Sequence, residues 1–317
     1  MSILLVGAQG QVGQELTKTL PVLAQTLGPL VAVGRAELDL TDLDVIASKV
    51  ATTQPKLIIN AAAYTAVDKA ESEPDLAHRI NAEAPGALAV AAAKCGASLV
   101  HISTDYVFSG QAPSPRTESD VTGPLSVYGK TKLAGEEAIR EALDSHMILR
   151  TAWVYGVHGK GNFVKTMLRL AGERSQLSVV ADQVGSPTWA KDIAETITAL
   201  SAHLLDPTEQ CAGTYHFTDS GTASWYDFAV AIFEEAKALG MLLAIDTVNP
   251  ITTAEYPTPA QRPPYSVLSG QKTAEALGHE APPGRESLKR MLKQDTKTQT
   301  GHEALARNRR RKNTKHD

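Results

Sequence analysis

The sequence predicts an α/β protein built on a doubly wound parallel sheet, with a smaller C-terminal portion. Short apolar runs rich in valine and isoleucine alternate with longer segments rich in alanine, leucine, glutamate and lysine. The apolar runs are continuous, which is typical of parallel strands that are buried on both faces. A glycine-rich turn directly follows the first run. Right-handed connections between such strands place helices on both faces of one sheet.

Each strand expected in the first half is one of these apolar runs: Ile3–Val6, Leu30–Val33, Leu57–Asn60, Leu99–Ile102 and Met147–Leu149. The segments between them predict helices that include Val12–Leu20, Leu76–Lys94 and Lys132–Leu143. After about Thr151 the alternation weakens, and further helices are expected near Asn162–Gly172, Asp192–Leu205 and Trp225–Leu239. Five prolines lie within Asn249–Pro264, which is therefore expected to be an extended, ordered loop.

Three regions are expected along the chain. Residues 1–151 form the sheet domain, to which later segments return, and residues 152–293 mainly form a smaller portion at the carboxyl edge of the sheet. Residues 294–317 are rich in lysine, arginine, threonine and glutamine. Such a segment buries too little apolar surface to offset its ordering entropy, so we expect a disordered basic tail.

Composition narrows the class of protein. The chain has 317 residues, of which 43% are hydrophobic and 21% charged, and its net charge is -4. This charge argues against a specific nucleic-acid binder, and no apolar stretch is long enough to cross a bilayer. Cys95 and Cys211 lie far apart, and the first apolar run begins next to Met1 with no secretory signal before it. We expect a soluble, cytoplasmic protein without a disulfide framework.

The glycine turn predicts a dinucleotide site. Gly7 allows the tight turn, Gly10 lets the backbone approach a pyrophosphate, and Gly13 lets the helix pack against the sheet. The backbone amides near Gln11 and Val12, at the helix N-terminus, would then face the phosphates. The G-x-x-G-x-x-G spacing resembles that of the extended short-chain dehydrogenases and reductases.

Other cofactor contacts are expected at the ends of the next two strands. Arg35 stands where an acidic residue usually holds the adenosine ribose, so we predict NADPH as the preferred cofactor and NADH as the alternative. In similar reductases the adenine lies beside the positions of Asp39 and Leu40. The small side chains after the third strand let the backbone approach the cofactor, and the expected contacts there are Ala61, Ala62, Ala63 and Thr65.

Tyr128 and Lys132 are separated by one helical turn, so they share a face of the predicted helix. The lysine ammonium is expected to lower the pKa of the phenol from about 10 and to hold the nicotinamide ribose. Thr104 follows the strand Leu99–Ile102, at the edge where open α/β sheets bind ligands. These three residues predict a Thr-Tyr-Lys set that protonates a carbonyl oxygen as hydride reaches its carbon.

A series of motifs resembles the dTDP-4-dehydrorhamnose reductases, which have a Rossmann fold. The similar stretches appear in order at residues 60–71, 103–108, 128–136, 150–155, 162–167, 182–188 and 256–263. The resemblance runs from Met1 to about Lys293. It implies hydride transfer from NAD(P)H to C4 of dTDP-4-dehydro-L-rhamnose, with Tyr128 as proton donor. The implied substrate contacts are Thr104, Asp105, Trp153, Asn162, Gln183 and Arg262.

Some members of this family resemble one another in a magnesium-bridged dimer. Glu15 is present, but Lys191 and Lys293-Gln294 stand where acidic partners are expected. Because a lysine disfavours a bound cation, we expect no metal site, and a monomer or weak homodimer.

Two alternatives remain. One is another nucleotide-sugar epimerase, dehydratase or reductase of the same superfamily, although a dehydratase typically has an Asp-Glu pair where Asp105-Tyr106 stands here. The other is a non-catalytic regulatory subunit resembling the β subunit of methionine adenosyltransferase, because fold does not fix function.

Overall fold

The structure is a computed structural model that describes residues 2–111, 114–209 and 211–296. In this part of the chain, one parallel sheet has the strand order β10-β5-β4-β3-β1-β2. Its strands are β1 (Ile3–Val6), β2 (Leu30–Val33), β3 (Leu57–Asn60), β4 (Ser98–Thr104), β5 (His146–Thr151) and β10 (Gly213–His216). The order reverses after β1, so the prediction of a doubly wound sheet is confirmed.

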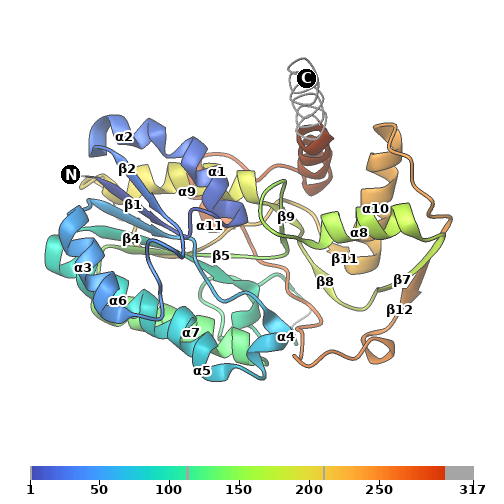
Figure 1. Cartoon of the computed structure of the whole chain (residues 1–317), viewed down its shortest axis with the longest axis horizontal. Coiled ribbons are helices and arrows are strands. Elements are labelled where there is room, and N and C mark those ends of the chain that lie inside the picture. Colours follow the sequence, from blue (N-terminus) through green and yellow to red (C-terminus); the bar gives the residue numbers. More distant parts are fainter. Residues whose placement is uncertain (1, 112–113, 210, 297–317) are drawn as a thin grey trace, which may run out of the picture.

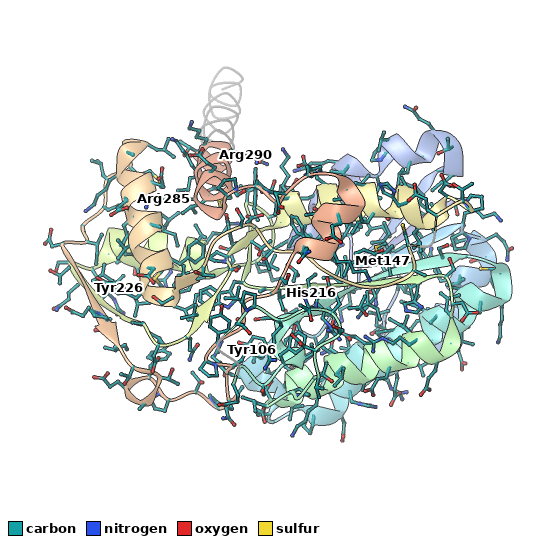
Figure 2. The ribbon with its side chains drawn as sticks, turned by 180° about the vertical axis from the view of Figure 1, so that it is seen from behind. Tyr106, Met147, His216, Tyr226, Arg285 and Arg290 are labelled. Carbon is teal, nitrogen blue, oxygen red and sulfur yellow. The ribbon has the colours of Figure 1, made fainter. Side chains whose placement is uncertain are left out.

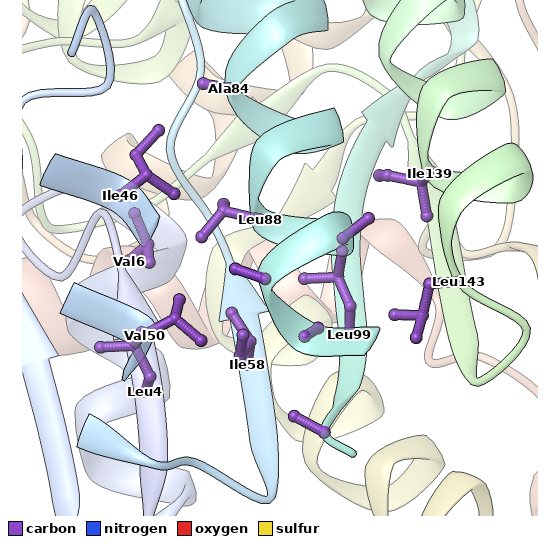
Figure 3. Close-up of a cluster of buried hydrophobic side chains, with 14 of the residues drawn as sticks. Leu4, Val6, Ile46, Val50, Ile58, Ala84, Leu88, Leu99, Ile139 and Leu143 are labelled. Carbon is purple, nitrogen blue, oxygen red and sulfur yellow. The ribbon is translucent and has the colours of Figure 1, made fainter. Parts of the chain in front are cut away.

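The two faces of the sheet are covered by different helices (Figure 1). Strand residues alternate between the faces, so that Leu4 and Val6 belong to one core while Ile3 and Leu5 belong to the other. The first core is closed by α3 (Leu43–Thr53), α6 (Ala84–Cys95) and α7 (Val127–Ala142), as Figure 3 shows. The second core is closed by α1 (Gln11–Thr19), α2 (Pro21–Leu27), α9 (Ala190–Leu205) and α11 (Gln271–Leu277).

A smaller portion lies beside the sheet and has its own apolar core. Its helices are α8 (Phe163–Glu173), α10 (Trp225–Ala238) and a last helix over residues 284–296. Three two-stranded pairs complete it: β6 (Val154–Tyr155) with β9 (Thr188–Trp189), β7 (Gln176–Val180) with β12 (Thr247–Ile251), and β8 (Val184–Gly185) with β11 (Ala223–Ser224). The chain enters this portion after β5 and returns to the sheet through α9 and β10.

Several elements differ from those expected. The elements α2, α3 and β10 were not expected from the sequence. The segment expected as one helix at Leu76–Lys94 is divided into α5 (Pro74–His78), a π-helical turn η1 (Arg79–Glu83) and α6. The short elements α4 (Val67–Ala70) and η2 (Asp105–Val107) were also not expected. The proline-rich segment begins in β12 and the turn η3 (Thr253–Glu255), so only its later part is a loop.

The expected basic tail falls almost entirely outside the described residues. Only 294–296 are described, and they continue the last helix. Among the described residues, no helix is long and apolar enough to span a membrane.

Candidate active site

The turn between β1 and α1 has the geometry of an anion site. Gly7 has φ +85°, and a Cβ there would lie 2.7 Å from the Ala62 backbone nitrogen. A Cβ on Gly13 would overlap the Gly7 carbonyl oxygen, whereas at Gly10 the nearest such contact among the described residues is 3.4 Å away. No described side chain caps α1, whose N-cap is Gly10, so the first amides of the helix are free to bind an anion.

Arg35 lies just beyond β2 and is exposed. The carboxylate of Glu37 accepts a hydrogen bond from the Gly34 amide at 2.9 Å, and it closes the turn in which Arg35 lies. Asp39 is also exposed and accepts hydrogen bonds from the amide and hydroxyl of Thr41, while Leu40 is buried in the first core. Arg35 is therefore available to a ligand. Leu40 is buried, so a ligand could contact only the edge of its side chain.

The alanines after β3 lie against the glycine turn. Ala61 donates its amide to the Val6 carbonyl at 2.9 Å, and the Ala62 amide donates to Asn60 Oδ1 at 3.1 Å. Ala61, Ala62 and Ala63 are partly exposed, and Thr65 is exposed. The small side chains leave this edge of the sheet open next to Gly7, as a dinucleotide requires.

Thr104 and Tyr128 meet at the carboxyl end of β4. Thr104 is the last residue of β4, and Tyr128 lies in the first turn of α7, which Ser126 caps by accepting from the Gly129 amide at 3.2 Å. Both side chains are buried. Burial raises the pKa of the Tyr128 phenol, although a hydrogen bond with Thr104 acts in the opposite direction. The phenol is thus held in its protonated form, ready to donate.

Lys132 corrects one expectation. Its Nζ donates to the Ile102 carbonyl at 2.7 Å and lies 2.9 Å from His101 Nε2, deep beneath the site. The expected lowering of the Tyr128 pKa by Lys132 is wrong for this structure. Burial is the largest effect on the pKa of the phenol, and Lys132 Nζ contacts Ile102 and His101 instead. Burial also lowers the pKa of Lys132 to about 8, with the Glu136 charge acting against it.

A buried ion pair lies beneath Thr104 and Tyr128. Glu136 accepts hydrogen bonds from Arg150 Nε and Nη2 at 2.9 and 2.7 Å, and from the Ser103 hydroxyl at 2.5 Å. This bidentate contact joins α7 to β5, and the Ser103 bond joins α7 to β4. Together, these contacts of Glu136 fix the helix that carries Tyr128 relative to the strand that carries Thr104.

Asp105 and Arg262 lie at the same edge. Asp105 is buried and accepts from the Thr104 hydroxyl at 2.9 Å, but its Oδ2 has no hydrogen-bond partner among the described residues. Burial raises its pKa to about 6, although the hydroxyls of Ser266 and Thr104 act to lower it. Arg262 donates to Asp68 at 2.9 Å and to the Tyr106 hydroxyl at 3.3 Å. Tyr106, labelled in Figure 2, packs edge-to-face on Tyr128 at 5.4 Å.

Trp153 and Gln183 are connected through a residue that the sequence analysis missed. Trp153 stacks on Trp225, which donates from its indole Nε1 to Gln183 Oε1 at 3.2 Å. Trp153 follows β5, whose Thr151 is paired with Thr104, so the aromatic pair extends from the catalytic edge into the smaller portion.

Asn162 lies against the glycine-rich turn. It caps α8, and its amide donates to Gln11 Oε1 and to the Gly156 carbonyl, each at 2.7 Å. These bonds link the glycine-rich turn to the smaller portion. They occupy the amide group, so a direct substrate contact by Asn162 stays a prediction.

Glu15 lies beside a lysine and a histidine. Glu15 is buried and forms an ion pair with Lys18 at 3.0 Å; His158 Nε2 lies 3.3 Å from Glu15, but burial lowers the pKa of this histidine, and Lys191 pairs with Glu195. Elsewhere, the ligand atoms of His203, Glu209 and Cys211 lie within 4.8 Å of one another, a proximity that the sequence analysis did not predict. The hydrogen bonds that His203 and Cys211 make to Glu209 account for this grouping without an ion.

His101 and Glu136 were also missed, although each carried a signal. His101 interrupts an apolar strand between Val100 and Ile102, and Glu136 shares a helical face with Lys132. A polar group at a core position requires a partner, so both positions pointed to a buried network.

Comparisons place this geometry among known proteins. The family model described as RmlD substrate binding domain matches residues 1–297. The dTDP-4-dehydrorhamnose reductase of Escherichia coli K12 is 47% identical over 298 residues, which cover 92% of this chain and 97% of that protein. The matches to two solved reductase structures each cover 92% of this chain and 99% of the chain in that structure. The structure from Clostridium acetobutylicum has a TM-score of 0.83 at 40% identity, and that from Bacillus anthracis, in complex with NADP, has 0.84 at 38%.

Proposed function

Because the chain belongs to the family of the dTDP-4-dehydrorhamnose reductases, we propose that it reduces dTDP-4-dehydro-L-rhamnose to dTDP-L-rhamnose with NADPH. The observation that carries this proposal is the contact between Thr104 and Tyr128, two buried hydroxyls at the carboxyl edge of the sheet. The uncapped, glycine-lined N-terminus of α1 lies at the same edge and fits a dinucleotide pyrophosphate.

NADPH, when bound, supplies the hydride that reaches C4 of the sugar. Tyr128 donates its phenolic proton to the C4 oxygen as negative charge develops there. Its raised pKa keeps the proton on the phenol until that charge appears, and Thr104 holds the phenol by the side-chain contact between them. Lys132, Gly10 and Arg35 are the groups that would hold the nicotinamide ribose, the pyrophosphate and the 2′-phosphate.

We assign sugar-nucleotide recognition to the residues around this edge. The unpartnered Oδ2 of Asp105 is suited to accept a hydrogen bond from a sugar hydroxyl, which would satisfy a buried polar atom. Trp153 offers an apolar face, and Arg262 a positive charge for the diphosphate. In this proposal residues 1–151 with α9 and β10 bind the cofactor, and most of 152–293 binds the dTDP-sugar.

The direct test is an assay with purified protein, NADPH and dTDP-4-dehydro-L-rhamnose, followed by identification of the sugar product. Equal molar loss of reduced nicotinamide and formation of dTDP-L-rhamnose support the proposal. An epimerase would give a changed sugar without net consumption of NADPH, and a regulatory subunit would give no turnover. A cytoplasmic location, and a monomeric or weakly dimeric state, stay predictions.

A further inference from the structure

Three buried side chains form a hydrogen-bonded row beneath the catalytic edge: Asn60 on β3, His101 on β4 and Lys132 on α7. Asn60 Nδ2 lies 3.1 Å from His101 Nδ1, and His101 Nε2 lies 2.9 Å from Lys132 Nζ. Each of these side chains is at most 1% exposed. None of them can exchange its partner for water without a rearrangement. Each contact in the row must therefore join one hydrogen-bond donor to one acceptor.

The row has a fixed direction because it begins at a backbone amide. The Ala62 N–H donates to Asn60 Oδ1 at 3.1 Å, and a backbone amide can only donate. The other end of the Asn60 amide, Nδ2, is therefore a donor toward His101 Nδ1. His101 must accept there, so the single proton of its neutral ring lies on Nε2.

The ring stays neutral because burial holds the pKa of His101 well below its usual value, and a charge on Lys132 would lower it further. The Nε2 proton consequently points at Lys132 Nζ. An ammonium group has no acceptor site, whereas an amine has one lone pair. The contact at 2.9 Å is satisfied only when Lys132 is an uncharged amine that accepts from His101 and donates to the Ile102 carbonyl.

The other charged or titratable groups around Lys132 do not remove this constraint. Glu136 lies one turn along α7 and its charge favours an ammonium, but it is neutralised by the bidentate contact with Arg150 on β5. Tyr128 lies one turn before Lys132 and is protonated. Burial outweighs the Glu136 charge and lowers the pKa of Lys132 to about 8.

We propose that His101, oriented by Asn60, is a positioning residue that stabilises the neutral amine of Lys132 in the cofactor-free protein, and that dinucleotide binding is therefore coupled to proton uptake by Lys132. This inference rests on the proposed function only for the identity of the ligand. The phosphates of a dinucleotide add negative charge, and its ribose hydroxyls accept hydrogen bonds from an ammonium. Both effects favour a charged Lys132 whose Nζ leaves His101, and the proton comes from solvent to the amine lone pair.

The sign of the pH dependence follows. Below about pH 8 Lys132 of the free protein is already an ammonium, which can no longer accept from His101, so binding takes up little. Above this pH the free amine is neutral, binding requires a proton, and the affinity for NADPH falls as the pH rises.

The first test uses the cofactor-free protein and does not depend on activity. Nitrogen NMR of ¹⁵N-histidine protein reports which ring nitrogen of His101 carries the proton, with His101→Gln used to assign the signals. We expect a proton on Nε2 and a bare Nδ1 at pH 9. A proton on Nδ1 would overturn the proposal, because Nε2 could then accept from an ammonium.

The second test measures proton uptake on NADPH binding by calorimetry in buffers of different ionisation enthalpy. At pH 8.5 the wild-type protein should take up most of one proton, and at pH 6.5 little. In His101→Gln the amide oxygen can turn to accept from an ammonium, and in Asn60→Asp the carboxylate draws the ring proton to Nδ1. Both substitutions should reduce the uptake at pH 8.5, whereas the exposed His279→Gln should not.

The outcomes separate this inference from the proposed function. Binding and turnover of the dTDP-sugar without uptake at pH 8.5, or equal uptake in wild type, His101→Gln and Asn60→Asp, would exclude the role of His101 and leave the reductase intact. If the protein gave no turnover, the His101 tautomer would still decide the proton arrangement. Should His101→Gln fail to fold, the tautomer and the wild-type uptake still test the proposal.

Discussion

Trp153 lies flat on Trp225, with their ring centroids 3.5 Å apart and their planes within 1° of parallel. Trp153 has φ +48°, an uncommon backbone conformation for a bulky residue. Trp225 is held in turn by Gln183 and by the Phe163 ring at 4.6 Å. Trp225 therefore fixes the orientation of the Trp153 ring.

Removing this support should weaken sugar binding. We expect Trp225→Leu to raise the KM for the dTDP-sugar about fivefold, since an aromatic pair contributes about 1 kcal/mol beyond its buried area. The affinity for NADPH should not change, because the glycine turn is untouched. Steady-state kinetics and cofactor titration check this, with Tyr226→Leu at the next position of α10 as the control. An unchanged KM in Trp225→Leu would show that Trp153 needs no such support.

Tyr128 is expected to carry the proton transfer. Tyr128→Phe should lower kcat by about 10²-fold or more while leaving the NADPH dissociation constant nearly unchanged, because only the transferable proton is removed. The matched control is Tyr155→Phe, which removes a hydroxyl buried in the core of the smaller portion. Parallel losses of turnover and cofactor affinity in Tyr128→Phe would instead indicate that Tyr128 only maintains the structure.

Arg35 is expected to select the phosphorylated cofactor. It is exposed beyond β2, and a charge-assisted contact to a 2′-phosphate contributes about 1.5–3 kcal/mol. Arg35→Ala should therefore weaken NADPH binding by about 10- to 100-fold and leave NADH binding nearly constant. Fluorescence titration with both cofactors measures the ratio, and Lys49→Ala, a substitution of a half-buried lysine on α3, serves as the control. A similar loss for both cofactors would remove the 2′-phosphate role of Arg35.

Most of the sheet could be predicted because the local sequence of each of these strands identifies it. Ile3–Val6, Leu30–Val33 and Leu57–Asn60 have the expected bounds, since each is a short apolar run bounded by polar or turn residues. The strand β10 was missed because Gly213–His216 contains one large apolar side chain, Tyr215, and becomes a strand by pairing with β5. That pairing depends on a partner more than sixty residues away, which no local pattern reports.

In the candidate site, too, local sequence patterns predict some features, whereas others depend on distant partners. Thr104, Tyr128 and Lys132 follow from spacing and strand ends, whereas the withdrawn position of Lys132 depends on His101 and Ile102 across the β4–α7 contact. The hydrogen bond between Asn162 and Gln11 was not expected, because the two residues are 151 positions apart in the sequence. Hydrogen bonds between distant side chains are set by packing, so sequence spacing predicts the residue types of the site more reliably than their partners.

The buried pair of Glu136 and Arg150 should make the free energy of unfolding depend on pH in the acidic range. Burial would raise the pKa of Glu136, but the hydrogen bonds and charge of Arg150 outweigh it and hold this pKa below its usual value. A carboxyl group whose pKa is lowered by folding stabilises the protein above its unfolded pKa, and this contribution is lost as the pH falls through the folded pKa. The contribution of Glu136 is therefore complete near neutral pH and declines below about pH 4.5.

Glu136→Gln removes the charge and leaves Arg150, which is 2% exposed, without its counter-ion. We expect a loss of about 3–5 kcal/mol in the free energy of unfolding at pH 7, since an unpaired buried charge is costly. The difference from wild type should shrink as the pH falls from about 4.5 toward the folded pKa of Glu136, because the wild-type carboxyl then also takes up a proton on unfolding. Denaturant unfolding at each pH measures this, with the exposed Glu275→Gln as the control. A difference that stays constant from pH 7 to 3 would mean that Glu136 contributes through packing and not through its charge.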